Sequence, residues 1–167
     1  MGFSGPKIHC GLPLIGAVVD RLLGSDLAAD PAFLLARARA VTSGTANARL
    51  APFQLKVRSL SVLWLAGQGI GPSQRELSEF LGLDPSQVVA LVDDLQRRGL
   101  VERRPDERDR RSRIIVATPA GRELLQQALT EVRAAGDTSF AALTGHERKT
   151  LTELLTKVAF GGRPAAQ

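Results

Sequence analysis

The sequence predicts a mainly α-helical protein with a small β-hairpin, and three observations support this. Apolar residues recur at helical spacing through most of the chain. Residues 113–117 instead have the short, β-branched pattern of a strand. With 44% apolar and 23% charged side chains, the 167 residues are typical of one globular domain, or of one domain with an appendage.

No membrane span is expected. The longest apolar stretch, residues 11–19, is shorter than the roughly 18 residues that a span needs, and Asp20 and Arg21 end it. Because no signal-type cleavage site follows before Asp26, we expect this stretch to be retained as part of an amphipathic helix. The single cysteine, Cys10, makes no internal disulfide, which suits a reducing compartment and predicts a cytoplasmic protein.

The N-terminal residues 1–29 form an extension with an apolar helical stripe that ends at Gly24. We expect this extension to enlarge a dimer interface; the alternative is that it covers the core of its own subunit. The next helix begins with Asp30 as N-cap and Pro31 in its first turn, and it is expected to reach Leu50.

A glycine-rich loop separates the following two predicted helices. Pro52 breaks the chain before the first of them, which ends at Gly67. Ser73 and Glu76 have the spacing of a capping box, and Gly82 is placed to be the left-handed C-cap of the short helix between them. The apolar face of that helix is expected to consist of Leu77, Phe80 and Leu81.

A second short helix follows at once, with Asp84 as N-cap, Pro85 in its first turn and Gln87 completing a second capping box. Its core face is expected to consist of Val88, Leu91, Val92 and Leu95. Two short helices joined by a glycine-containing turn are typical of a helix-turn-helix.

Beyond Gly99 the pattern changes to that of strands. Residues 100–101 and 113–117 flank the charged run 105–112, which predicts a hairpin with a long basic tip. Joined to the preceding helices, this hairpin makes a winged helix-turn-helix, which we assign to residues 53–118.

Two further helices are predicted, one from Thr118-Pro119 to near Gly136 and one from the capping box of Thr144 and Glu147. Each has an apolar face outside the winged domain, and a second copy of the chain is the simplest partner for it. The other predicted regions are a helical dimerisation region, 30–52 and 119–160, and a flexible tail, 161–167.

The charge distribution points to nucleic acid. The net charge is +5, and residues 97–113 hold eight arginines against four acids. Arginine binds phosphate with two parallel hydrogen bonds, so a nucleic-acid backbone is the natural partner of this segment. A solvated, self-neutralising loop is the alternative.

The candidate DNA contacts lie on the outer face of the second short helix and in the wing. Gln87 suits an adenine edge, Ser86 suits a phosphate or a base, and Asp109 is expected to orient a neighbouring guanidinium. Asp94 would repel phosphate if it faced the DNA backbone. We therefore expect other residues to supply most of the affinity for DNA. The full set is Ser73, Gln74, Arg75, Pro85, Ser86, Gln87, Ala90, Arg97, Arg98, Arg108, Asp109, Arg110 and Arg111.

From Asp30 to about Val158, the order of elements and the residues at their junctions resemble the MarR family of bacterial transcription regulators. The most specific features are the D-x-R-D-x-R pattern of residues 106–111 and the helix start with Thr118 and Gly121. The resemblance implies an obligate dimer formed by the first and last helices. It also implies binding to pseudo-palindromic operators, repression by default, and an effector that changes the spacing of the two DNA-binding heads.

The resemblance further implies a small aromatic or phenolic effector in a cleft between the dimer helices and the winged domain. The candidate lining residues are Phe53, Arg58, Ser59, Leu60 and Trp64, whose spacing fits core packing equally well. Some family members sense peroxide through an N-terminal cysteine held by tyrosines, so a redox-responsive regulator acting through Cys10 is an alternative. The chain has no tyrosine, which favours an incidental cysteine.

Neither a metal, a cofactor nor catalysis is expected. His9, His146 and Cys10 are too few and too scattered for a zinc site. No nucleophile, base and orienting group have catalytic spacing. The remaining alternative is a winged-helix module whose basic wing binds an acidic protein, and the D-x-R-D-x-R pattern favours DNA over it.

Overall fold

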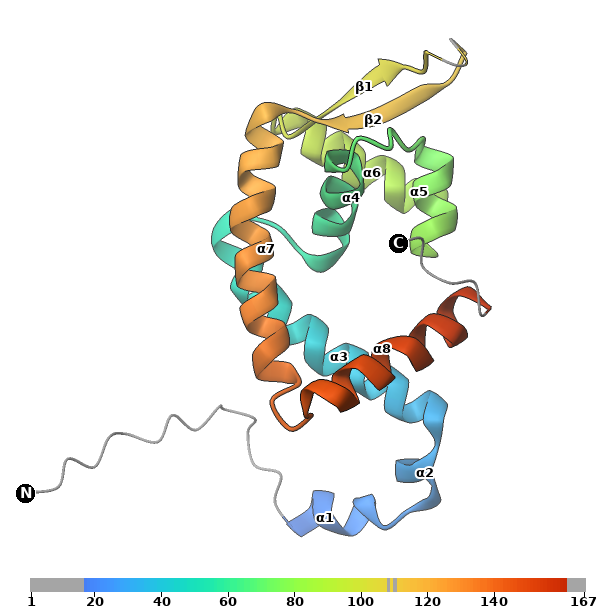
Figure 1. Cartoon of the computed structure of the whole chain (residues 1–167), viewed down its shortest axis with the longest axis vertical. Coiled ribbons are helices and arrows are strands. Elements are labelled where there is room, and N and C mark those ends of the chain that lie inside the picture. Colours follow the sequence, from blue (N-terminus) through green and yellow to red (C-terminus); the bar gives the residue numbers. More distant parts are fainter. Residues whose placement is uncertain (1–16, 108, 110, 162–167) are drawn as a thin grey trace, which may run out of the picture. The chain divides into compact units, whose positions relative to one another are not determined.

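The computed structural model describes residues 17–107, 109 and 111–161, so Cys10 and His9 lie outside the described residues. The chain divides into two compact units, Met1–Ala40 and Val41–Gln167. Figure 1 labels the elements in chain order. They are α1 (Ala17–Leu23), α2 (Asp26–Ala29), α3 (Pro31–Leu50), the 3-10 turn η1 (Ala51–Phe53), α4 (Val57–Gly67), α5 (Gln74–Leu81), α6 (Pro85–Arg97), β1 (Val101–Pro105), β2 (Arg113–Ala117), α7 (Pro119–Ser139) and α8 (Gly145–Phe160).

The predicted fold class is confirmed, and so are most of the predicted helix starts. The Ser73–Glu76 and Thr144–Glu147 capping boxes are both formed. At the end of α5, Gly82 has φ 60° and ψ 39°, the left-handed conformation for which glycine pays no steric cost. These starts and stops were predictable because each depends on residues within one helical turn.

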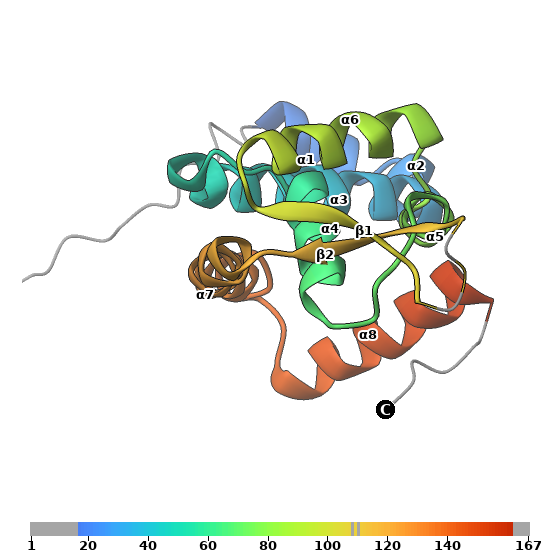
Figure 2. The same ribbon diagram turned by 90° about the horizontal axis from the view of Figure 1, so that it is seen from above.

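Helix α4 lies at the centre of the second unit. It contacts α5, α6, β2 and α7, and in Figure 2 the two strands of the hairpin cross it. The core around α4 includes the fully buried side chains of Leu63, Leu77, Leu95 and Ile115. The helix-turn-helix and the hairpin are therefore packed onto a common core.

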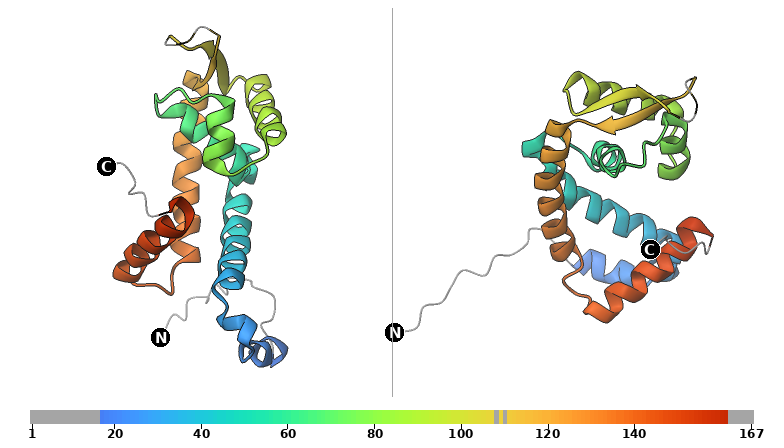
Figure 3. Two further views of the ribbon diagram at one scale, coloured as in Figure 1. Left: turned by 90° about the vertical axis from the view of Figure 1, so that its right-hand side faces the viewer. Right: turned by 45° about the horizontal axis from the view of Figure 1, so that its top comes forward.

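The two strands pair antiparallel, from Val101 opposite Ala117 to Pro105 opposite Arg113. The loop before α5 extends this pairing, because the Ile115 N–H donates to the Pro72 carbonyl at 2.8 Å and Ser73 forms an isolated bridge with Ile114. The hairpin is thus attached to the start of α5 as well as to the end of α6 (Figure 3).

The start of α7 explains why a glycine stands at residue 121. A Cβ atom on Gly121 would lie 1.9 Å from the carbonyl oxygen of Leu100, which no side chain can tolerate. The Thr118 side chain accepts from the Gly121 N–H at 3.0 Å and donates to the Gly99 carbonyl at 2.7 Å. Through Thr118 and Gly121, the start of α7 packs directly against Gly99 and Leu100, which precede β1.

Three predicted features were wrong in detail. Helix α4 begins at Val57, two residues after the predicted start at Leu55, because Gln54 is left-handed (φ 52°) and Leu55 is buried in the core before the helix begins. Helix α7 continues through Gly136 to Ser139, since one glycine lowers helix propensity without ending a helix. Asp84 caps α6 by accepting from the Ser86 N–H, and the second capping box with Gln87 is not formed.

Phe80 is a further correction, because it lies at the edge of the core and is 59% exposed. Its ring stacks on that of Phe160 at the end of α8, with centroids 5.6 Å apart. Helical spacing places Phe80 near Leu77 and Leu81, but it does not distinguish the centre of a buried face from its margin.

The terminal helices keep large apolar side chains on the surface of the single chain. Helix α8 buries none of its residues, and neither does α2. The exposed apolar side chains of α1, α2, α3 and α8 include Leu22, Leu23, Leu27, Leu34, Leu35, Val41, Leu154, Leu155, Val158 and Phe160. In the described part of the chain, no helix has both the length and the apolar character that a membrane span requires.

Candidate nucleic-acid interface

Helix α6 has a buried face and an exposed face, as predicted. Val88, Val92 and Leu95 are fully buried, whereas residues 86, 87, 89 and 90 are exposed. The exposed residues belong to the first two turns, which are the turns that a helix in the major groove uses to reach base edges. The inner face therefore anchors α6 and leaves its outer face for a partner.

The first turn of α6 is ordered by Asp84. Its carboxylate accepts from the Ser86 N–H at 2.8 Å and from the Ser86 hydroxyl at 2.5 Å. These hydrogen bonds from Ser86 hold the pKa of Asp84 below its ordinary value. The hydroxyl hydrogen of Ser86 is thus already used in a hydrogen bond, and the hydroxyl oxygen can only accept a further one. Within the described residues, the side chain of Gln87 has no hydrogen-bond partner, so its amide is available for a base.

Arg103 on β1 joins three elements through contacts that no local sequence pattern indicates. Its guanidinium donates to Gln74 on α5 at 3.2 Å, to Gln96 on α6 at 2.6 Å and to Asp93 on α6 at 2.5 Å. The side chain is only 25% exposed. These contacts set the relative positions of α5, α6 and the wing.

The predicted contacts at the start of α5 have different surroundings. The Ser73 hydroxyl is used in the capping box with Glu76, and the Gln74 amide oxygen accepts from Arg103. Arg75 is turned to solvent and pairs with Glu79 at 2.8 Å, an interaction that raises the pKa of the Arg75 guanidinium. Of these three residues, Arg75 is the one presented as an exposed cation.

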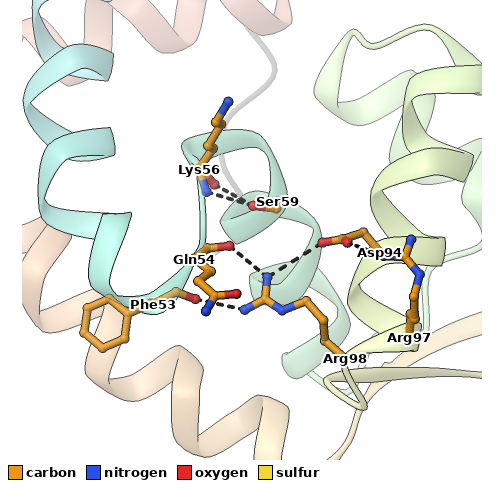
Figure 4. Close-up of polar contacts among 7 residues, drawn as sticks. All are labelled: Phe53, Gln54, Lys56, Ser59, Asp94, Arg97 and Arg98. Carbon is orange, nitrogen blue, oxygen red and sulfur yellow. Dashed lines mark hydrogen bonds and ion pairs between the residues drawn. The ribbon is translucent and has the colours of Figure 1, made fainter.

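The end of α6 carries an arginine pair with two roles (Figure 4). Arg97 is exposed and donates to Asp94 at 3.0 Å. Arg98 turns the other way and donates to the main-chain carbonyls of Gln54, at 2.8 Å, and Phe53, at 2.9 Å. Asp94 also lies 3.7 Å from Arg98, so its charge is balanced by both arginines. The structure thus places Arg98 as a tether of the loop after α3, and Arg97 as the exposed cation.

The predicted effector-lining residues surround the α3–α4 junction but are not equally accessible. The Asn47 side chain accepts from the Val57 N–H at 2.9 Å, and the Ser59 hydroxyl bonds both main-chain groups of Lys56 at 2.9 Å. Leu60 is buried in the core, and Ser59 is buried beside it. Phe53 is partly buried, and Arg58 and Trp64 are exposed. Only the last three retain surface for a ligand.

The tip of the wing is closed by Asp109. Its carboxylate accepts from the Arg111 N–H at 3.0 Å, and its carbonyl accepts from the Ser112 N–H at 2.9 Å. Within the described tip, Asp109 therefore orients the main chain of Arg111, and the orientation of a neighbouring guanidinium by Asp109 stays a prediction. Arg111 is exposed, and Arg108 and Arg110 lie outside the described residues.

The described residues contain no group of three or more His, Cys, Asp or Glu side chains able to hold a metal ion. The site consists instead of an exposed helix face, a basic hairpin and exposed arginines. Such a surface is suited to a nucleic-acid backbone and to base edges in a groove.

Comparisons with known proteins agree with this geometry. The family model described as "MarR family" matches residues 53–112, which include α4, the helix-turn-helix and the first strand of the wing. The regulator CouR of Rhodococcus jostii, solved with p-coumaroyl-CoA, is 40% identical with a TM-score of 0.77, over 85% of this chain and 100% of that chain. The repressor CouR bound to a 23-mer DNA duplex is 31% identical with a TM-score of 0.74, over 82% of this chain and 96% of that chain.

A curated relative gives the same result. The HTH-type transcriptional regulator BilQ of Clostridium symbiosum is 31% identical over 103 residues, which are 60% of this chain and 72% of BilQ. These relatives are transcriptional regulators and not enzymes. The chain belongs to the MarR family of transcriptional regulators.

Proposed function

We propose that this chain is a dimeric repressor that binds a pseudo-palindromic DNA operator and is released from it by a small aromatic effector. The observation that carries the proposal is the outer face of α6, fixed to α5 and to the basic wing by Arg103. The similarity to CouR, which was solved on a 23-mer duplex, supports double-stranded DNA as the partner.

In the proposed complex, Gln87 and the neighbouring exposed residues of α6 meet base edges in the major groove. Arg75, Arg97 and Arg111 bind phosphates, and the tip of the wing, including Arg108 and Arg110, enters the minor groove or follows the backbone. The proposed surface is held in place by Ser73, Gln74 and Arg98. Their side chains form hydrogen bonds within the chain and are not proposed to contact DNA.

Fluorescence anisotropy of a labelled duplex tests the binding proposal. The duplex is selected by the wild-type protein from a random library, and a scrambled duplex of the same composition is the control. We expect a preference of at least about 10³-fold and a linear fall of log affinity with log salt. Equal, weak binding to both duplexes would favour the alternative of a basic module that binds an acidic protein.

The dimer is proposed from the apolar side chains of α8, of which Leu154 and Val158 are exposed in the single chain. Exposed apolar patches of this kind mark association surfaces. A symmetric dimer would place two α6 helices for the two halves of a palindrome. The N-terminal extension, residues 1–29, is proposed to add to this interface.

The effector is proposed to be a small aromatic or phenolic acid, or its thioester, near Phe53, Arg58 and Trp64. CouR, 40% identical to this chain, was solved with p-coumaroyl-CoA. The test adds p-coumaroyl-CoA, p-coumarate or coenzyme A to the preformed complex with DNA. Release by one of the aromatic compounds, and not by coenzyme A, supports the proposal, and Arg58→Ala is expected to weaken that release.

Repression and redox sensing need separate tests. A reporter gene behind the selected operator is expected to be silenced by the protein and restored by the effector; increased expression would identify an activator. The redox alternative predicts that peroxide lowers DNA affinity in the wild type and not in Cys10→Ser. We expect equal peroxide responses in the two proteins.

A further inference from the structure

The exposed face of α6 contains an apolar side chain among its polar neighbours. Val89 is 44% exposed, although it lies in the same two turns as Ser86 and Gln87. Pro85, one turn earlier, is exposed too, and the pair lies at the spacing of four residues that brings side chains together on a helix surface. Neither side chain belongs to the core.

Val89 and Pro85 form one wall of a hollow between α5 and α6. The hollow has a volume of about 400 Å³ and is lined by Gln74, Arg75, Ser78, Glu79, Pro85 and Val89. Helices α5 and α6 lie side by side there (Figure 3). The Arg75–Glu79 ion pair belongs to the opposite wall, on α5. The hollow is therefore bordered on α6 by Val89, an exposed residue of the first two turns.

The chemistry of this wall selects an apolar occupant. A polar base edge placed against Val89 and Pro85 would lose hydrogen bonds to water without replacing them, which is costly. In the major groove of DNA, the apolar group is the C5-methyl of thymine. Water held against the same wall gains few hydrogen bonds, so its displacement by a methyl group is favourable.

We propose that Val89, with Pro85, recognises a thymine of each operator half-site through its C5-methyl group. This inference rests on the proposed function and makes it more specific, because it assigns one base type to one side chain. Gln87 then reads an adjacent base by hydrogen bonds, independently of Val89.

The test replaces each dT of the selected duplex by dU in turn, which removes a single methyl group from the groove. We expect at least one position in each half-site at which wild-type affinity falls about fourfold, the equivalent of about 0.8 kcal/mol for one methyl-sized apolar group. Val89→Ala is expected to lose a similar factor on the original duplex. On the dU duplex it loses little more, because the two changes remove the same contact.

Two variants serve as controls. Gln87→Ala is expected to bind more weakly while keeping the fourfold discrimination between dT and dU. Val89→Asn places a polar amide against the methyl group in place of an apolar side chain, and it is expected to lose the discrimination. Since Val89 is exposed, these variants should unfold at nearly the wild-type temperature, which circular dichroism checks.

The outcomes are distinguishable. A protein that binds its selected duplex and ignores every dU substitution overturns this inference alone. So does a Val89→Ala variant that still discriminates dT from dU at all positions. A protein that selects no duplex overturns the proposed function, and this inference with it.

Discussion

The helices of the winged region and the last helix of the chain differ in how much of their apolar faces they bury. In α6, Val88, Val92 and Leu95 are fully buried, whereas α8 also has apolar residues at helical spacing and buries none of them. Val158 of α8 is 72% exposed. Both stripes have helical spacing, so the pattern alone does not separate them. The winged region forms a core within one chain, whereas the apolar side chains of α8 stay exposed in it.

This contrast separates the parts of the chain that fold the DNA-binding surface from those that need a partner. The winged region buries most of its apolar groups in its own core, and its exposed polar groups are proposed to bind DNA. The terminal helices keep apolar groups on the surface, where a second copy is proposed to cover them. Substitutions in the two regions should therefore affect different observables.

The largest effect is expected from charges on α8. In Leu154→Asp/Val158→Asp, two carboxylates would be buried without partners in the proposed dimer interface, which is strongly unfavourable. We expect monomers and a loss of about 10³-fold in operator affinity, down to the level of non-specific binding. Light scattering and anisotropy measure these two changes, and the far-ultraviolet circular dichroism should be retained. A dimer with full affinity would contradict the contrast.

A truncation in the winged core should act on stability instead. Leu95→Ala leaves a cavity beneath α6, and we expect the free energy of unfolding to fall by about 2–5 kcal/mol. Urea denaturation measures it. Val89→Ala on the exposed face of the same helix is the matched control, with a change within about 0.5 kcal/mol. Similar losses in both variants would show that α6 is not anchored as described.

Arg103 is expected to position the reading surface. Arg103→Met removes hydrogen bonds to Gln74, Gln96 and Asp93, and we expect operator affinity to fall about tenfold, or about 1.4 kcal/mol. The salt dependence should be unchanged, because Arg103 binds no phosphate. Arg104→Met is the control, since Arg104 pairs with Glu102 and is more exposed. A lower salt slope in Arg103→Met would mean that Arg103 contacts DNA directly.

The smallest effect is a loss of stability in acid. Hydrogen bonds from Ser86 and Thr144 hold the pKa values of Asp84 and Glu147 below their ordinary values. Each carboxylate therefore stabilises the fold above its unfolded pKa, and this contribution is lost as the pH falls through the lower folded pKa. Urea midpoints between pH 6 and pH 3 measure the loss, and Asp84→Asn, which caps without titrating, should show less of it.

The sequence predicted the local features of this fold better than its long-range contacts. The caps at Ser73 and Thr144 depend on neighbours three residues away and were found. Arg103 meets Gln74 across 29 residues, and Arg98 meets Gln54 across 44, and no local pattern indicates such pairs. Phe80 was assigned to the core because helical spacing does not reveal where a packed face ends.

The candidate DNA contacts were likewise predictable only where they follow from a local pattern. The exposed face of α6 followed from its apolar stripe, and Gln87, Ala90 and Arg97 are exposed as that stripe implied. Arg98 was grouped with Arg97 because both are arginines at the end of one helix. Only the fold reveals that Arg98 turns inward to the carbonyls of the loop after α3.

Sedimentation of the full chain, alone and with the selected duplex, tests the central contrast most directly. The account predicts a species of twice the 17.8 kDa of one chain and a complex of two protomers on one duplex, with no single-protomer complex at lower protein concentration. A stable monomer that binds each half-site independently would contradict it, because the apolar face of α8 would then have no partner in the DNA-binding protein.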